Sequence, residues 1–88
     1  MDQALQFRVD AIQSDKLRHY RKTAKESQFR FWSRFGVTQS RGSRFEQGAD
    51  IPAPVAILLG LYFNGVITDS DLHAAGERYQ IFNRMLKD

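Results

Sequence analysis

The residues best suited to chemistry in this sequence form one polar run, residues 38–47, which reads Thr-Gln-Ser-Arg-Gly-Ser-Arg-Phe-Glu-Gln. The run opens with short polar and basic side chains, whose hydroxyl, amide and guanidinium groups can hydrogen-bond to base edges and to phosphates. A helix that begins in this way is typical of an element that enters the major groove of DNA. The run therefore predicts a recognition helix.

Two short helices joined by a tight turn would position this run. Ser27 and Thr38 are good N-caps for two helices, one over 28–35 and one that starts after Thr38 and ends before Gly48. Gly36 can adopt the left-handed conformation that ends the first of them. Residues 27–48 therefore predict a helix-turn-helix.

The basic residues are concentrated on and just before this unit. Residues 16–45 hold nine basic residues and one acidic residue, a net charge of +8, whereas the whole chain carries +3. A local cluster of cations attracts phosphate by counterion release. Charge and motif together indicate a nucleic-acid partner.

The remaining elements predict a scaffold for one domain, residues 1–88. Residues 14–25 predict a helix, and residues 54–63 predict a helix that is apolar nearly all round. Asn64-Gly65 would end that helix, and Thr68–Asp71 resembles a capping box for a last helix with an apolar stripe from Leu72 to Leu86. The alternation over residues 4–12 predicts either a short strand, paired with a second copy, or a frayed arm, within residues 1–13. The predicted class is all-α, a four- to five-helix domain in which residues 53–88 form the core and dimerisation helices.

The order of caps, turn glycine and polar helix resembles the lambda-repressor-like (Cro/C1/Xre) DNA-binding domains. Further matches, among them Phe31–Gly36, Gly42–Glu46 and Pro52-x-Pro54, are similar to the RsaL-like repressors. The resemblance implies a transcriptional repressor of quorum-sensing signal synthesis that binds double-stranded DNA as a homodimer on a partly palindromic operator.

The resemblance also assigns residue roles. Gln28 would bind a phosphate and brace the recognition helix, while Gln39, Ser40 and Arg44 would reach base edges. Thr38 is expected to cap the helix. The residues implied in DNA binding are Lys22, Lys25, Gln28, Arg30, Thr38, Gln39, Ser40, Arg41, Ser43, Arg44 and Gln47.

One departure from the family pattern lies between the two helices. The family usually has a small residue where Trp32 stands and a branched apolar residue where Gly42 stands. Since glycine inside a helix costs about 0.5–1 kcal/mol relative to alanine, it requires a reason. We expect the indole of Trp32 to fill the space that Gly42 leaves.

Other function classes find little support in the sequence. The chain has no cysteine and two distant histidines, so we expect no enzyme, cofactor, metal site or small-molecule ligand. The longest apolar run, residues 55–63, is too short for a membrane span, and the N-terminus lacks a signal peptide, so we expect a cytoplasmic protein. The phenylalanines and Trp32 are expected in the core, and Arg34 with Glu46 as a solvated ion pair. The alternative function is a protein-interaction module, an antitoxin or adaptor, which would explain the apolar helix at 54–63.

Overall fold

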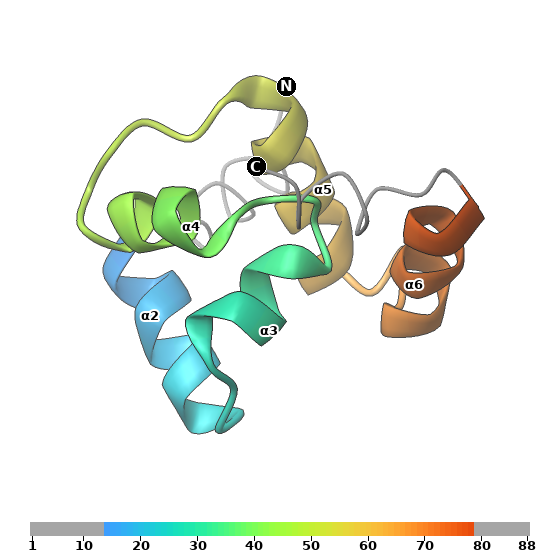
Figure 1. Cartoon of the computed structure of the whole chain (residues 1–88), viewed down its shortest axis with the longest axis horizontal. Coiled ribbons are helices and arrows are strands. Elements are labelled where there is room, and N and C mark those ends of the chain that lie inside the picture. The colour runs from blue at the N-terminus through green and yellow to red at the C-terminus, as the bar shows by residue number, and fades with distance from the viewer. Residues whose placement is uncertain (1–13, 79–88) are drawn as a thin grey trace.

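A computed structural model of the chain describes residues 14–78. These residues form five helices and no strand: α2 (Ser14–Thr23), α3 (Gln28–Ser33), α4 (Gln39–Glu46), α5 (Ala53–Phe63) and α6 (Asp69–Arg78) (Figure 1). The predicted all-α class is confirmed. The strand or arm predicted within residues 1–13, and residues 79–86 of the last predicted helix, lie outside the described residues.

The predicted N-caps form as expected from the sequence. The side-chain oxygens of Ser27 and Thr38 accept the backbone N–H groups of Arg30 and Arg41, at 3.1 and 3.3 Å. At the start of α6, Thr68 and Asp71 bond each other's backbone N–H groups reciprocally, at 2.9 and 3.2 Å. The helix starts are therefore specified locally, by side chains three residues from their partners.

Helices α2 to α5 all end in the same way. A residue with positive φ follows each helix, two positions beyond its end for α2, α4 and α5 and three positions beyond it for α3. The backbone N–H of the next residue donates to a carbonyl five residues earlier, as in a Schellman motif. The four positive-φ residues are Lys25 (59°), Gly36 (74°), Gly48 (106°) and Gly65 (77°). The stops predicted at Gly36 and Gly65 are confirmed. The helix predicted over 14–25 is shorter than expected, because it ends at Thr23 and Lys25 lies in the turn.

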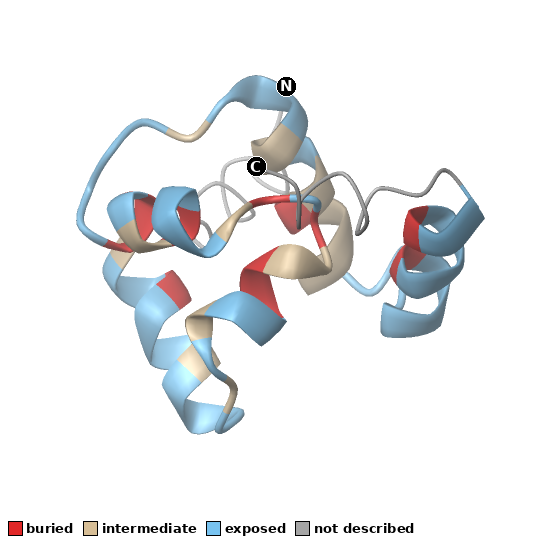
Figure 2. Cartoon of the chain, in the orientation of Figure 1, coloured by how far each residue is buried: buried red, intermediate tan, exposed pale blue. Residues whose placement is uncertain are grey.

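All five helices contribute to one hydrophobic core, shown by the red segments of Figure 2. Its buried members are Leu17, Phe31, Trp32, Phe35, Val37, Phe45, Leu59 and Leu72. Trp32 is fully buried, and its ring meets those of Phe31 and Phe45 edge to face, with centroids 5.1 and 5.5 Å apart. The prediction of a core position is therefore confirmed for these aromatics, but it is wrong for Phe29, whose side chain is 52% exposed.

The contact between α3 and α4 pairs the largest core side chain with a glycine. Gly42 is buried, and an ideal Cβ built on it would lie 2.8 Å from Cδ2 of Trp32 and closer still to Cγ and Cδ1. The expectation that Trp32 occupies the space left by Gly42 is confirmed. This close approach sets how α4 lies on α3.

Helix α6 stands at the far side of the molecule from α2, beyond α5 (Figure 1). Its Asp69 forms an ion pair with Arg34 in the turn after α3, with Oδ1 of Asp69 3.1 Å from Nε of Arg34. The guanidinium carbon of Arg34 also lies 5.6 Å from the ring centroids of both Phe31 and Tyr62. Arg34 therefore links the helix-turn-helix to α5 and α6.

Candidate nucleic-acid interface

The outer face of α4 carries the polar residues that the sequence predicted for base contact. Gly42, Phe45 and Glu46 are buried on the inner side of the helix. At 100° per residue, Ser40, Arg44 and Gln47 lie on the opposite side, and all three are exposed. Gln39 and Arg41 flank them, also exposed, and Ser43 is half-buried.

Several of these side chains are available to an external partner. Among residues 14–78, the side chains of Ser40, Arg41 and Arg44 make no hydrogen bond or ion pair with one another or with the remainder, while Nε2 of Gln47 lies 3.5 Å from Oγ of Ser43. An exposed guanidinium without an internal acceptor can form the bidentate bond that guanine O6 and N7 offer. Thr38 differs, because its hydroxyl is occupied in capping α4.

Gln28 connects α3 to the start of α4. Its side-chain oxygen lies 3.5 Å from Nε2 of Gln39, and its own Nε2 donates to Oε1 of Glu46 at 3.3 Å. Gln28 therefore contacts both the first and the last residue of α4, and the DNA-binding role that the resemblance gave to it stays a prediction.

The carboxylate of Glu46 is the buried anchor of the interface. Its side chain is 2% exposed and accepts hydrogen bonds from three residues on two helices: Nε and Nη2 of Arg21 on α2 at 2.8 and 2.9 Å, and Nε1 of Trp32 at 2.8 Å and the Gln28 amide on α3. Burial alone would raise the pKa of Glu46, but the hydrogen bonds from Arg21, Trp32 and Gln28 outweigh it and lower the pKa. The carboxylate of Glu46 is therefore ionised, both of its oxygens accept hydrogen bonds, and it fixes α4 to both α2 and α3.

The prediction of an ion pair between Arg34 and Glu46 is wrong. Arg34 instead makes a bidentate pair with Glu26, with both N–O distances at 2.7 Å. The hydrogen bond from Arg34 lowers the pKa of Glu26 and raises that of Arg34. One signal could have identified the true partner of Glu46: Arg21 follows the buried Leu17 by four residues, so it lies on the inner face of α2.

The basic segment divides into internal and external cations. Arg21 and Arg34 are internal, with side chains 11% and 14% exposed. The other seven basic residues of 16–45 are exposed: Lys16, Arg18, Lys22, Lys25, Arg30, Arg41 and Arg44. The electrostatic footprint is therefore smaller than the +8 of the sequence, and it lies on α2, the following turn, α3 and α4.

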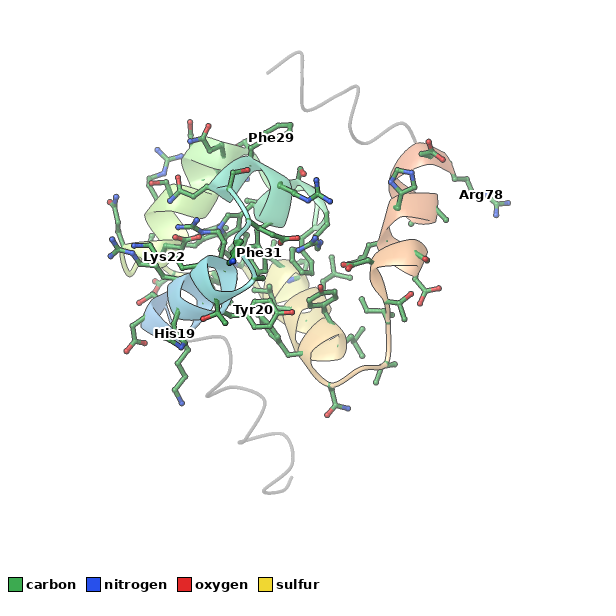
Figure 3. All side chains as sticks on the ribbon, turned by 90° about the horizontal axis from the view of Figure 1, so that it is seen from below. His19, Tyr20, Lys22, Phe29, Phe31 and Arg78 are labelled. Carbon is green, nitrogen blue, oxygen red and sulfur yellow. The ribbon has the colours of Figure 1, made fainter. Side chains whose placement is uncertain are left out.

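The predicted phosphate contacts Lys22, Lys25 and Arg30 all lie on this surface. Figure 3 labels Lys22 on α2, and the side chain of Arg30 is 75% exposed, with only a 3.6 Å contact from its Nε to Glu26. The same view places Phe29 on the outer side of α3, whereas Phe31 turns inward among α2, α3 and α5. Phe29 is thus an exposed aromatic beside the polar surface.

Lys25 occupies a backbone conformation that the other helix ends give to glycine. Its φ of 59° places it in the left-handed region, at the position equivalent to Gly36, Gly48 and Gly65. For a side chain with a Cβ this region costs about 1–2 kcal/mol. A lysine at this position is therefore unfavourable for the fold, which is consistent with a role in contacts outside it.

Within residues 14–78, no group of three or more His, Cys, Asp or Glu side chains is placed to hold a metal ion. The described helices are all too short or too polar to cross a bilayer. An open depression of about 250 Å³ lies between α3 and α6, lined by Arg30, Ser33, Arg34, Asp69 and His73. Its Arg34 and Asp69 are already paired with each other.

The comparisons with known proteins agree with this geometry. Neither a curated protein nor a solved structure gives a significant match. The family model of the RsaL-like HTH domain matches residues 18–62, which span α2 from Arg18 through nearly all of α5. The matched range contains the recognition helix, the buried Glu46 and every residue predicted to contact DNA. This chain therefore belongs to the RsaL-like helix-turn-helix family, whose fold is that of a DNA-binding regulator.

Proposed function

We propose that the protein is a sequence-specific transcriptional repressor that binds double-stranded DNA as a homodimer. One observation carries the proposal: Ser40 and Arg44 have no side-chain partner among residues 14–78, and they lie on the outer face of a helix that the buried Glu46 fixes in place. Side chains held in one orientation can discriminate base edges, because the geometry of each pairing is specific.

In this proposal the contacts divide into two kinds. Gln39, Ser40 and Arg44 read bases in the major groove, with Ser43 and Gln47 beside them. The outer cations Lys22, Lys25, Arg30 and Arg41, together with Gln28, bind phosphates and so position the protein without reading sequence. Arg44 takes guanine, since an arginine fork matches O6 and N7.

The dimer would place two recognition helices about 34–36 Å apart, in successive turns of the major groove. A partly palindromic operator follows from that symmetry, and repression follows from occlusion of RNA polymerase. The likeness to the RsaL-like repressors extends the proposal to genes of quorum-sensing signal synthesis. Residues 53–88 would supply the dimer contacts of a single DNA-binding domain.

The experiment that tests this function is selection of genomic fragments by the purified protein at two salt concentrations. We expect one enriched, dyad-symmetric motif that persists at the higher salt. Recovery of unenriched DNA that is lost at the higher salt would contradict sequence-specific binding, since non-specific affinity is almost wholly electrostatic.

A further inference from the structure

None of the other described residues (14–78) covers one apolar surface of α5, the helix that separates the helix-turn-helix from α6. Leu59 is fully buried on the inner side of α5. At 100° per residue, Pro54, Ile57 and Leu61 lie on the opposite side, with Ala53 and Gly60 along its edge. We define these five residues as the outer face of α5.

The outer face of α5 is available for contact. Ile57 is 62% exposed, and Leu61 is half-buried but is not among the side chains packed on the core. A Cβ built on Gly60 would meet nothing within 4 Å. Ile57 is therefore a protruding apolar side chain, and Gly60, three residues later, leaves a recess on the same surface. The two positions lie within one helical turn of each other.

The charge of α5 indicates which partner fits. Its sequence, Ala-Pro-Val-Ala-Ile-Leu-Leu-Gly-Leu-Tyr-Phe, has no charged residue, whereas each of the other four described helices has at least one. When two copies of the same surface meet across a two-fold axis, residues close to the axis lie near their own copies, so a charge there would be repelled by its equivalent. A face without charge avoids that repulsion, and the outer face of α5 is therefore compatible with its own copy.

We infer that the outer face of α5 forms the homodimer contact, with Ile57 of each copy packing against Gly60 of the other. The inference rests on the proposed function, which requires two copies on one operator. An eleven-residue helix is about 16 Å long, and one of its faces is smaller than the roughly 800 Å² per partner of a standard interface. The free dimer is accordingly weak, and the two copies associate cooperatively on DNA.

Disulfide trapping tests the contact without DNA. The chain has no cysteine, so Ile57→Cys introduces a single thiol on the outer face of α5. Ala74→Cys, at an exposed position of α6, is the matched control. Under mild oxidation of concentrated protein we expect covalent dimers from Ile57→Cys well above the control. Equal yields from the two variants would overturn the inference.

Binding to duplexes with one or two half-sites tests its consequence. Ile57→Lys places like charges near the axis, and Gly60→Leu fills the recess from a Cβ position that has no neighbouring atom within 4 Å. We expect both variants to keep parental affinity for one half-site and to lose the cooperativity of two half-sites, by about 5-fold to 150-fold. Parental cooperativity in both variants would overturn the inference. Failure of the parent to bind either duplex would instead contradict the proposed function, while the trapping result would still decide the α5 contact.

Discussion

Replacement of Gly42 by alanine sets two physical effects against each other at the α3–α4 contact. Alanine favours a helix interior over glycine by about 0.5–1 kcal/mol. The new methyl group would lie under 3 Å from three atoms of the Trp32 ring. That separation is shorter than van der Waals contact, so either the ring or α4 must move.

The Trp32 ring has little freedom to move. It is fully buried, its Nε1 donates to Glu46 at 2.8 Å, and the rings of Phe31 and Phe45 pack against it. Overpacking of this kind costs about 1–3 kcal/mol. Subtracting the helix-propensity gain leaves a cost of about 0–2.5 kcal/mol. Because the ring is held on several sides, we expect Gly42→Ala to lie in the upper part of this range and to lower the free energy of unfolding by about 1–2 kcal/mol.

Denaturant and thermal melts measure this difference. For a domain of this size, a loss of 1–2 kcal/mol lowers the Tm by roughly 4–16 °C. The control is Gly60→Ala in dilute protein, where the outer face of α5 is solvated. Since nothing lies within 4 Å of the added Cβ, the free energy of unfolding of that variant should rise by about 0.5–1 kcal/mol.

A second test combines a larger residue at position 42 with a smaller one at position 32. Gly42→Val alone should cost more than Gly42→Ala, because it adds two further methyl groups against the ring. In the Trp32→Ala background, the same valine should restore stability, since the ring no longer occupies the space. A Gly42→Ala variant at least as stable as the parent, or a valine that is equally harmful with and without the ring, would refute the packing argument.

Three further outcomes follow from the interface. Lys25→Gly should raise the free energy of unfolding by about 1 kcal/mol while weakening DNA binding uniformly, with a log–log salt slope shallower by about 0.9; a loss of stability in a denaturant melt would contradict the backbone argument. Arg44→Ala should lose about 1–3 kcal/mol of affinity at one base pair of each half-site, and an equal loss on all sequences would make it a phosphate contact. Glu46→Gln should cost about 2–3 kcal/mol at pH 7. Because the pKa of Glu46 is lowered in the folded state, its stabilisation is complete above the unfolded value of about 4.3 and is lost as the pH falls through the folded value, so the gap between variant and parent should narrow in acid. A constant gap from pH 7 to 3 would show that Glu46 is not held as the ionised partner of Arg21.

The parts of the fold that are local in sequence could be predicted. Ser27, Thr38 and Thr68 each cap a helix through a bond that spans three residues, and Gly36 and Gly65 close the following turns. Such interactions depend on a few neighbouring residues, so the sequence alone carries their signal. The outer face of α4 could be predicted for the same reason, since it follows from helical periodicity.

The parts that depend on how distant helices meet could not be predicted in the same way. Glu46 pairs with Arg21, twenty-five residues away, and not with Arg34, because α2 packs against the inner side of α4. Phe29 has the composition of a core residue, but α3 turns its inner side to the core through Phe31 and Trp32 and leaves Phe29 outside. In both cases the helix itself was predicted from the sequence, but the helices that pack against it, and hence the face that it buries, were not.

Under the proposed function, the outer face of α4 reads base sequence while the surrounding cations supply a sequence-independent attraction. The most direct measurement is the affinity of the protein for its selected motif and for a shuffled duplex of equal composition, over a series of salt concentrations. We predict similar log–log salt slopes for the two duplexes and an affinity ratio of about 10³ or more at each salt concentration. Equal affinities for the two duplexes across the series would contradict the account.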